Sequence, residues 1–258
     1  MVAENVLPEI ISAAEISPAD TVLEIGMGTG ILTAALAKRA GQVISVEIDR
    51  ELYAEYAPRV AIYPNVRVIC GDFLREAEDI FRSARGRLKV IANIPYYITT
   101  PILEKLLEYR ARLSTVVLMV QKEVAERICA APCSGAYGSL TIFLRYYADA
   151  RLICLVTPEC FRPRPQVDSA VLRLDIRPEL KYQPLSEKRF FNIVRGAFWG
   201  RRKTLRNTLK QAPYTHYTAA MLAKLERETG LDLNRRGETL SIEEFVHLAN
   251  VDFASETI

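Results

Sequence analysis

Short apolar runs alternate with helical stretches through the first half of the chain. Five runs of mostly β-branched and aliphatic residues occur, at residues 21–25, 43–47, 66–70, 88–92 and 115–121. They read as continuous apolar runs rather than as strict alternation of apolar and polar residues, as is typical of strands covered on both faces. Helices are predicted between them, at residues 32–39, 51–60, 101–113 and 123–129. Strands and helices alternating at this pitch predict an α/β fold with a parallel, doubly wound, Rossmann-like sheet.

Prolines mark two boundaries in this pattern. Thr100 precedes Pro101, so we expect Thr100 to cap a helix that has proline at its first position. Further along, two apolar runs at residues 152–156 and 170–176 frame a proline-rich loop. These two runs predict strands that form an antiparallel edge of the sheet.

The pattern of apolar and polar residues changes after Arg177. Residues 177–240 show helical periodicity and almost no strand signal. We therefore predict two domains, an α/β domain over residues 1–177 and a smaller all-helical domain over residues 178–258.

The net charge is small, but the basic residues are concentrated in one region. The chain has 34 Lys and Arg against 31 Asp and Glu, whereas residues 177–240 alone hold 14 basic and 6 acidic residues. Residues 188–210 hold eight basic residues and no acid. Such a run suits contacts with nucleic-acid phosphates, with a solvated helix face as the alternative. We expect Phe198 and Trp199, which lie within it, to pack between the domains.

Several classes of protein are excluded by composition. No stretch approaches ~20 uncharged apolar residues, so no transmembrane helix is expected. The acidic N-terminus lacks the basic region of a signal peptide. The five cysteines include no Cys-x-x-Cys pair, and the two histidines are far apart. We therefore expect no metal site and no disulfide framework, but reduced thiols in a cytoplasmic, monomeric protein.

A glycine-rich turn follows the first predicted strand. The strand leads into Gly26, Gly28 and Gly30, and glycines at a strand-to-helix turn let the backbone approach a ligand closely. The spacing differs from the G-x-G-x-x-G of dinucleotide-binding proteins. Glu24 stands two residues before the first glycine, where a carboxylate suits a ligand with an ammonium and a sulfonium group.

Acids also end the next two predicted strands. Glu47 is placed to accept hydrogen bonds from both hydroxyls of a ribose. Asp72, after Gly71, can accept from the exocyclic amine of an adenine. We include Gly71, the neighbouring Ile48 and Phe73, and Asn93 in the same cofactor site. Each acid alone could be a solvated charge at a strand end. Together with the glycines they describe a site for S-adenosylmethionine (SAM).

The fourth predicted strand ends in Asn93-Ile-Pro-Tyr96, which suggests the reaction. The N6 amine of adenine is a poor nucleophile, because its lone pair is delocalised into the ring. The Asn93 side-chain oxygen and the Pro95 carbonyl can each accept one N6–H, which would localise the lone pair and direct it at a methyl group. Tyr96 offers a ring face on which a flipped base can stack.

The sequence resembles the ribosomal RNA adenine N6-dimethyltransferases over nearly its whole length, from about residue 6 to residue 250. The matching segments are Glu24-Ile-Gly-Met-Gly-Thr-Gly30, Glu47-Ile-Asp49, Gly71-Asp72, Asn93-Ile-Pro-Tyr-Tyr-Ile-Thr-Thr-Pro101, Gln121-Lys-Glu-Val124, Phe161-Arg-Pro-Arg-Pro-Gln-Val-Asp-Ser-Ala170 and Arg201-Arg-Lys-Thr-Leu-Arg-Asn207. The resemblance implies a SAM-binding catalytic domain followed by an RNA-binding domain. It also implies that Phe161 sandwiches the target adenine opposite Tyr96.

The resemblance further implies dimethylation of two adjacent adenosines in a hairpin loop near the 3′ end of small-subunit rRNA. We expect phosphate contacts from the basic run, at Arg201, Arg202, Lys203 and Arg206. One alternative is a large-subunit rRNA dimethyltransferase of the antibiotic-resistance type, against which the motifs at residues 167–170 and 201–207 argue.

Another alternative is a ribosome-assembly factor with little turnover. Family members usually carry a Gly-Gln-x-Phe-Leu segment that helps to cover the cofactor, and Met1 falls just after where it would stand. Its absence from this sequence favours the assembly factor, whereas the intact segment 93–96 argues against it.

Overall fold

The computed structural model describes residues 6–93, 98–161, 164 and 166–253. The chain divides into two compact units. The first comprises Met1–Ala125 and Tyr147–Pro178, and the second comprises Glu126–Tyr146 and Glu179–Ile258. The second unit thus includes 21 residues from the middle of the chain besides the C-terminal part. The assignment of catalysis to residues 1–177 and of RNA binding to residues 178–258 stays a prediction.

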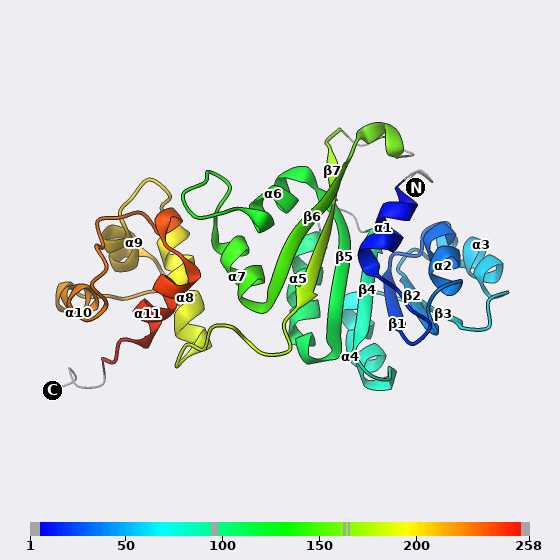
Figure 1. The fold of residues 1–258 in the computed structure, drawn as a ribbon, viewed down its shortest axis with the longest axis horizontal. Coiled ribbons are helices and arrows are strands. Elements are labelled where there is room, and N and C mark those ends of the chain that lie inside the picture. The colour runs from blue at the N-terminus through cyan, green and yellow to red at the C-terminus, as the bar shows by residue number, and fades with distance from the viewer. Residues whose placement is uncertain (1–5, 94–97, 162–163, 165, 254–258) are drawn as a thin grey trace. The chain divides into compact units, whose positions relative to one another are not determined.

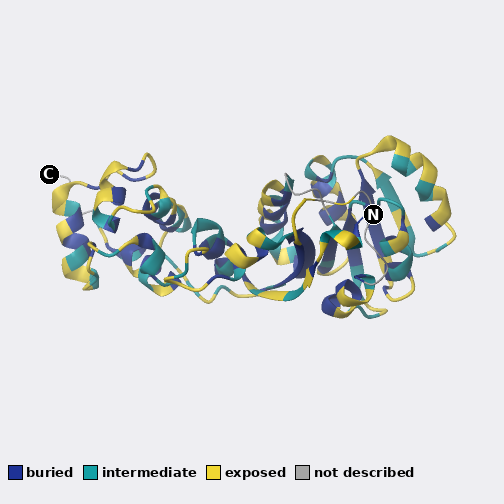
Figure 2. Cartoon of the chain, turned by 90° about the horizontal axis from the view of Figure 1, so that it is seen from above, coloured by how far each residue is buried: buried dark blue, intermediate teal, exposed yellow. Residues whose placement is uncertain are grey.

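The first unit is built on a sheet with the strand order β3-β2-β1-β4-β5-β7-β6 (Figure 1). The strands are β1 (Thr21–Ile25), β2 (Gln42–Glu47), β3 (Val66–Cys70), β4 (Leu88–Asn93), β5 (Leu113–Gln121), β6 (Ala148–Val156) and β7 (Ser169–Ile176). Strands β1 to β5 pair in parallel, whereas β7 pairs antiparallel with both β5 and β6. The predicted Rossmann-like sheet with an antiparallel edge is therefore confirmed. Most residues of β1, β2, β4, β5 and β7 are buried, as expected of strands covered on both faces, whereas the edge strands β3 and β6 are mostly half-buried or exposed (Figure 2).

The crossover helices fix where a ligand can bind. The helices of this unit are α1 (Leu7–Ala14), α2 (Ile31–Ala37), α3 (Arg50–Val60), α4 (Phe73–Ser83), α5 (Thr99–Glu108) and the start of α6 (Lys122–Cys129), with short 3-10 turns at Arg110–Arg112 and Pro158–Cys160. Because parallel crossovers are right-handed, connections that run outward from β1 to β3 and those from β3 to β5 place their helices on opposite faces. The strand order thus reverses between β1 and β4, and ligands bind at the carboxyl ends of strands at such a switch point.

Local sequence explains most element boundaries, with one correction. Asp49 and Asp72 cap α3 and α4 by accepting hydrogen bonds from backbone N–H groups of the first turn. Helix α5 begins at Thr99 with Ile98 as its N-cap, so the expectation that Thr100 caps this helix was wrong. The N–H groups of the first helical turn have no acceptor within the helix, so proline, which lacks an N–H, is tolerated throughout that turn. The helix can therefore start two residues before Pro101.

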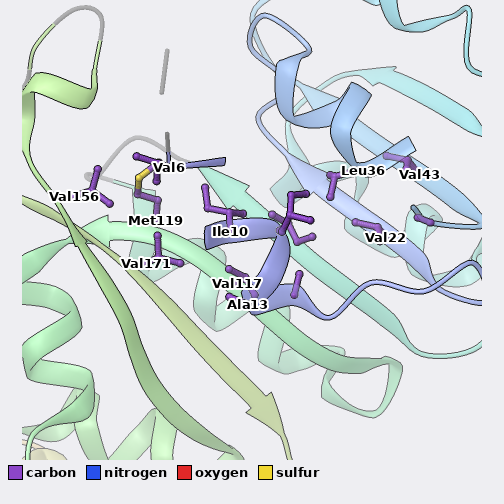
Figure 3. Close-up of a cluster of buried hydrophobic side chains, with 14 of the residues drawn as sticks. Val6, Ile10, Ala13, Val22, Leu36, Val43, Val117, Met119, Val156 and Val171 are labelled. Carbon is purple, nitrogen blue, oxygen red and sulfur yellow. The ribbon is translucent and has the colours of Figure 1, made fainter. Parts of the chain in front are cut away.

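A large apolar cluster holds the first unit together (Figure 3). Val6, Ile10 and Ala13 of the α1 region pack with residues of the central strands, including Val117, Met119 and Val171 (Figure 3). The buried Arg173 fixes the end of α1, because its guanidinium donates to the Ala13 carbonyl at 2.7 Å and contacts the Glu15 carboxylate.

The second unit is helical. Its elements are the end of α6, α7 (Ser139–Tyr147), α8 (Glu187–Phe198), α9 (Leu205–Gln211), α10 (Ala219–Thr229), a 3-10 turn at Gly237–Thr239 and α11 (Ile242–Asn250). The Phe198 ring lies 5.9 Å from that of Tyr137 and 6.2 Å from that of Phe245. The Tyr137 hydroxyl donates to the Leu240 carbonyl at 2.9 Å, so the middle segment is bound to the C-terminal helices. Phe198 thus packs inside this unit, where we had expected it between the domains.

The described residues contain no candidate membrane span and no candidate metal cluster. None of the helices in this part of the chain is long and apolar enough to cross a membrane. Over the same residues, no group of three or more His, Cys, Asp and Glu side chains is placed to hold a metal ion. The five cysteines are free thiols.

Candidate active site

The glycine turn after β1 leaves room for a ligand. Gly26, Gly28 and Gly30 have φ angles of +86°, +56° and +77°, a left-handed conformation that favours glycine. A Cβ atom on Gly28 would meet nothing within 4 Å, so the backbone faces open space there. A Cβ atom on Gly26 would lie 3.4 Å from the carbonyl oxygen of Asn93. The glycine turn and the end of β4 therefore meet at the switch point.

Glu47, at the end of β2, ties this turn to the next helix. Its Oε2 accepts from the Gly28 N–H at 2.8 Å, and its Oε1 accepts from the Asp49 N–H at 2.9 Å. The side chain is buried. Each carboxylate oxygen can accept a second hydrogen bond, so Glu47 retains capacity for the hydroxyls of a ribose. The same carboxylate thus holds the turn in place and remains suited to the predicted contact.

The remaining predicted cofactor residues lie after β2 and β3. Ile48 is 65% exposed, an unusual degree for an isoleucine, and offers an apolar surface next to Glu47. The Gly71 N–H donates to the Glu47 carbonyl at 2.9 Å, which brings the ends of the two strands together. Asp72 uses Oδ1 to accept from the Leu74 N–H at 3.0 Å, while its Oδ2 lies 4.0 Å from the Arg75 guanidinium.

Phe73 contributes differently from Ile48. Its side chain is buried as the first residue of α4. The N–H of a first helical residue has no acceptor inside the helix. Any contact of Phe73 with a ligand is therefore limited to this backbone donor.

Glu24 lies beneath the turn rather than in it. It has no exposed surface, and its Oε2 accepts from the Ser45 and Thr33 hydroxyls at 2.6 Å each. Its Oε1 is buried without a hydrogen-bond partner among the described residues. Burial raises the pKa of Glu24 to about 7, with a further contribution from Glu47, although the two hydroxyls act in the opposite direction.

This geometry indicates how Glu24 would act on a cationic ligand. Because the carboxylate is enclosed, its effect would be electrostatic rather than a direct contact. Ser45 and Thr33, which donate to Glu24, were not among the residues predicted from the sequence. Ser45 is a polar residue inside an apolar strand, and that interruption was the available signal.

The predicted catalytic residues are only partly within the described structure. Asn93 is the last residue of β4 and is half-buried. Pro95 and Tyr96 lie outside the described residues. Phe161 is 9% exposed and belongs to the apolar cluster that includes Val6 and Val156. The stacking role of Phe161 stays a prediction, and it would use the small part of the ring that the cluster leaves uncovered.

The four cations predicted to bind RNA differ in their surroundings. Arg206 pairs with Glu226. Arg201 donates to the Gly135 carbonyl and lies 4.0 Å from the Glu238 carboxylate. Lys203 donates to the Gln211 side-chain oxygen at 2.7 Å. Arg202 is exposed and, within the described part of the chain, makes no hydrogen bond or ion pair. Of the four, Arg202 is the most available to a phosphate.

Comparisons with known proteins identify the family of this chain. Residues 1–248 match the family model described as ribosomal RNA adenine dimethylase. A ribosomal RNA small subunit methyltransferase A from Clostridium botulinum (strain Loch Maree / Type A3) is 45% identical over 250 residues, covering 97% of this chain and 90% of the relative. Its counterpart from Moorella thermoacetica is 44% identical over 257 residues, covering 96% and 88%.

Solved structures show the same architecture. A dimethyladenosine transferase from Plasmodium falciparum superposes with a TM-score of 0.81 at 28% identity, covering 96% of this chain and 95% of its own. The 23S rRNA methyltransferase ErmE superposes with a TM-score of 0.72 at 27% identity, covering 95% and 96%. The chain belongs to the ribosomal RNA adenine dimethylase family.

Proposed function

We propose that this protein uses SAM to dimethylate N6 of two adjacent adenosines in a hairpin loop near the 3′ end of small-subunit rRNA. The observation that carries the proposal is the meeting of the glycine turn with Asn93 at the switch point of the sheet. It brings a predicted cofactor site next to a side chain that can bind an adenine amine.

The residues present fit SAM. The open space at Gly28 admits a ligand against the backbone, and the Glu47 carboxylate retains acceptor capacity for ribose hydroxyls. The second oxygen of Asp72 and the exposed Ile48 suit an adenine amine and an adenine face, respectively. The buried, unpartnered Oε1 of Glu24 supports a positively charged ligand nearby. When bound, SAM would supply an electrophilic methyl group.

The chain's own residues would prepare the nucleophile. Asn93 accepts one N6–H through its side-chain oxygen, and Pro95 is predicted to accept the other through its carbonyl. Both hydrogen bonds favour a geometry in which the lone pair is localised on N6 and directed at the methyl group. Tyr96 and Phe161 are predicted to hold the base between two rings, which fixes its orientation. No base is needed before methyl transfer, because the amine becomes acidic once it is methylated.

The relatives support the small subunit as substrate. The curated relatives of 40–45% identity that cover 95–97% of this chain are named as small-subunit methyltransferases. The 23S rRNA methyltransferase ErmE is only 27% identical to this chain, well below the identity of those relatives. The large-subunit alternative is therefore not favoured, and neither is a ribosome-assembly factor with little turnover.

Transfer of tritium from labelled SAM tests this proposal. Undermethylated small subunits should accept label from the parent protein, and large subunits from the same cells should not. Asn93→Ala protein, checked for cofactor binding by calorimetry, serves as the matched control and should transfer very little. Label in the large subunits alone would contradict the small-subunit assignment. Absence of label from both would contradict the enzyme assignment.

A further inference from the structure

Trp199 lies on the solvent-facing side of α8, where we had expected packing. It is the only tryptophan in the chain, and its side chain is 51% exposed. Its backbone N–H donates to the Gly196 carbonyl at 3.2 Å, so the residue continues the last turn of the helix. The last turn of α8 therefore fixes the backbone from which the indole projects.

The two sides of α8 have opposite character. Its buried residues are Phe190, Ile193, Val194, Gly196 and Ala197. Lys188, Asn192, Arg195 and Trp199 follow one another at spacings of four, three and four residues, which places them along one stripe of the helix. Lys188, Arg195 and Trp199 are exposed, and Asn192 is half-buried. The exposed stripe thus carries two cations and ends in the indole.

The turn after α8 adds further positive charge around the indole. The Lys203 ammonium lies 5.7 Å from the centre of the Trp199 ring, and Arg202 is exposed. We call Arg195, Trp199, Arg202 and Lys203 the Trp199 patch.

Acidic residues do not neutralise this patch. Residues 188–210 contain no acid. Among the described residues, two carboxylates from elsewhere in the second unit approach the run: Glu226 pairs with Arg206, and Glu238 lies near Arg201. For Arg195 and Arg202, no ion pair occurs among the described residues.

We propose that Trp199 stacks on an unpaired base of the RNA while Arg195, Arg202 and Lys203 contact the adjacent phosphates. Cations without acidic partners complement a polyanion, and a flat exposed ring among them distinguishes nucleic acid from other anions. An unpaired nucleotide is the fitting partner, because its base can stack on an aromatic side chain, whereas bases inside an A-form helix are inaccessible. The inference rests on the proposed function, since it assigns a contact to the same ribosomal RNA.

The single tryptophan makes the contact directly observable. We would excite the indole of the unaltered protein and add a single-stranded RNA oligonucleotide, a fully paired RNA duplex or poly-glutamate. Stacking predicts strong quenching by the single strand and little by the duplex or poly-glutamate. Quenching by poly-glutamate alone would overturn the proposal and indicate an acidic protein partner. Emission that no addition changes, and that iodide fails to quench, would show an indole packed away from RNA.

Variants separate stacking from charge. Trp199→Ala should weaken binding to undermethylated small subunits by roughly 5- to 150-fold, and Trp199→Phe should retain most of the affinity. The slope of log affinity against log salt should stay at the parent value in both, because no phosphate contact is lost. Tyr214→Ala is the matched control, since Tyr214 is another exposed aromatic of this unit and is 45% exposed.

Parent-like affinity of Trp199→Ala would overturn the inference while leaving the proposed function intact, provided that the parent methylates these subunits. If the parent itself transfers no methyl group, the proposed function fails instead. Thermal melting of each variant establishes that it is folded.

Discussion

Replacing Glu24 by glutamine should change how the stability of this protein depends on pH. Burial holds the pKa of Glu24 near 7 in the folded protein, against an ordinary value of 4.5. The folded state therefore binds a proton at this site between pH 4.5 and about 7, where the unfolded chain has released it. The free energy of unfolding that depends on this proton is therefore highest below pH 4.5. It decreases as the pH rises from 4.5 to about 7, because ionising the buried carboxyl costs more than ionising it in the unfolded chain. At ~1.4 kcal/mol for each pH unit, the loss amounts to about 3 kcal/mol.

The Glu24→Gln protein lacks this titration. Its free energy of unfolding should therefore rise relative to that of the parent by about 3 kcal/mol between pH 4 and pH 8. The comparison uses the change with pH, because an amide in this enclosed position also leaves buried donors without acceptors and lowers stability at every pH. Urea unfolding followed by circular dichroism, at several pH values across this range, measures the difference.

A surface glutamate provides the control for this experiment. Glu55 is an exposed residue of α3 that pairs with Arg59 at 3.1 Å. Glu55→Gln should follow the pH dependence of the parent closely, because exposed pairs contribute little to stability. Parallel curves for the parent and Glu24→Gln would refute the reasoning, since they would show that Glu24 is ionised in the fold at its ordinary pKa.

Further predictions concern the cofactor site, the catalytic site and the basic run. Asn93→Ala should leave cofactor affinity nearly unchanged in calorimetry and lower turnover by ~100-fold or more, and unchanged turnover would remove Asn93 from the site. Glu47→Ala should weaken SAM binding by ~10- to 150-fold, because a charged acceptor is lost, and a change below twofold would place the ribose elsewhere. Arg202→Gln should reduce the salt slope of subunit binding by ~0.7–0.9, whereas Arg206→Gln should leave it nearly unchanged, because Arg206 pairs with Glu226. Equal slopes for both variants and the parent would mean that Arg202 makes no phosphate contact.

The strands of the first unit could be predicted from the sequence because their signal is local. The run Thr21–Ile25 is mostly apolar, with Glu24 as its one charged residue, and the strand has those bounds. Helix α4 escaped prediction although its buried residues Phe73, Ala77 and Ile80 have helical spacing. Asp72 is the N-cap of α4 as well as a predicted cofactor residue, and the prediction from the sequence covered only its contact with the cofactor.

Features that depend on contacts distant in the sequence could not be predicted. Glu24 is enclosed because Ser45, 21 residues away, donates a hydrogen bond to it from the neighbouring strand. The pairing of Arg206 with Glu226 depends on how α9 and α10 approach each other. The exposure of Trp199 has the same origin, because the buried side of α8 is decided by packing within the second unit. The spacing of residues along the chain indicates which residue types a site contains, but it does not indicate which distant residues they contact.

The most direct test of the central claim is a chemical analysis of the methylated RNA. Undermethylated small subunits would be incubated with this protein and SAM, and the recovered rRNA would be digested and analysed by mass spectrometry. We expect N6,N6-dimethyladenosine at two adjacent positions of one hairpin loop near the 3′ end of the small-subunit rRNA. We also expect that neither position is modified by the Asn93→Ala protein. Methylation of another base, or of large-subunit RNA alone, would contradict the central claim.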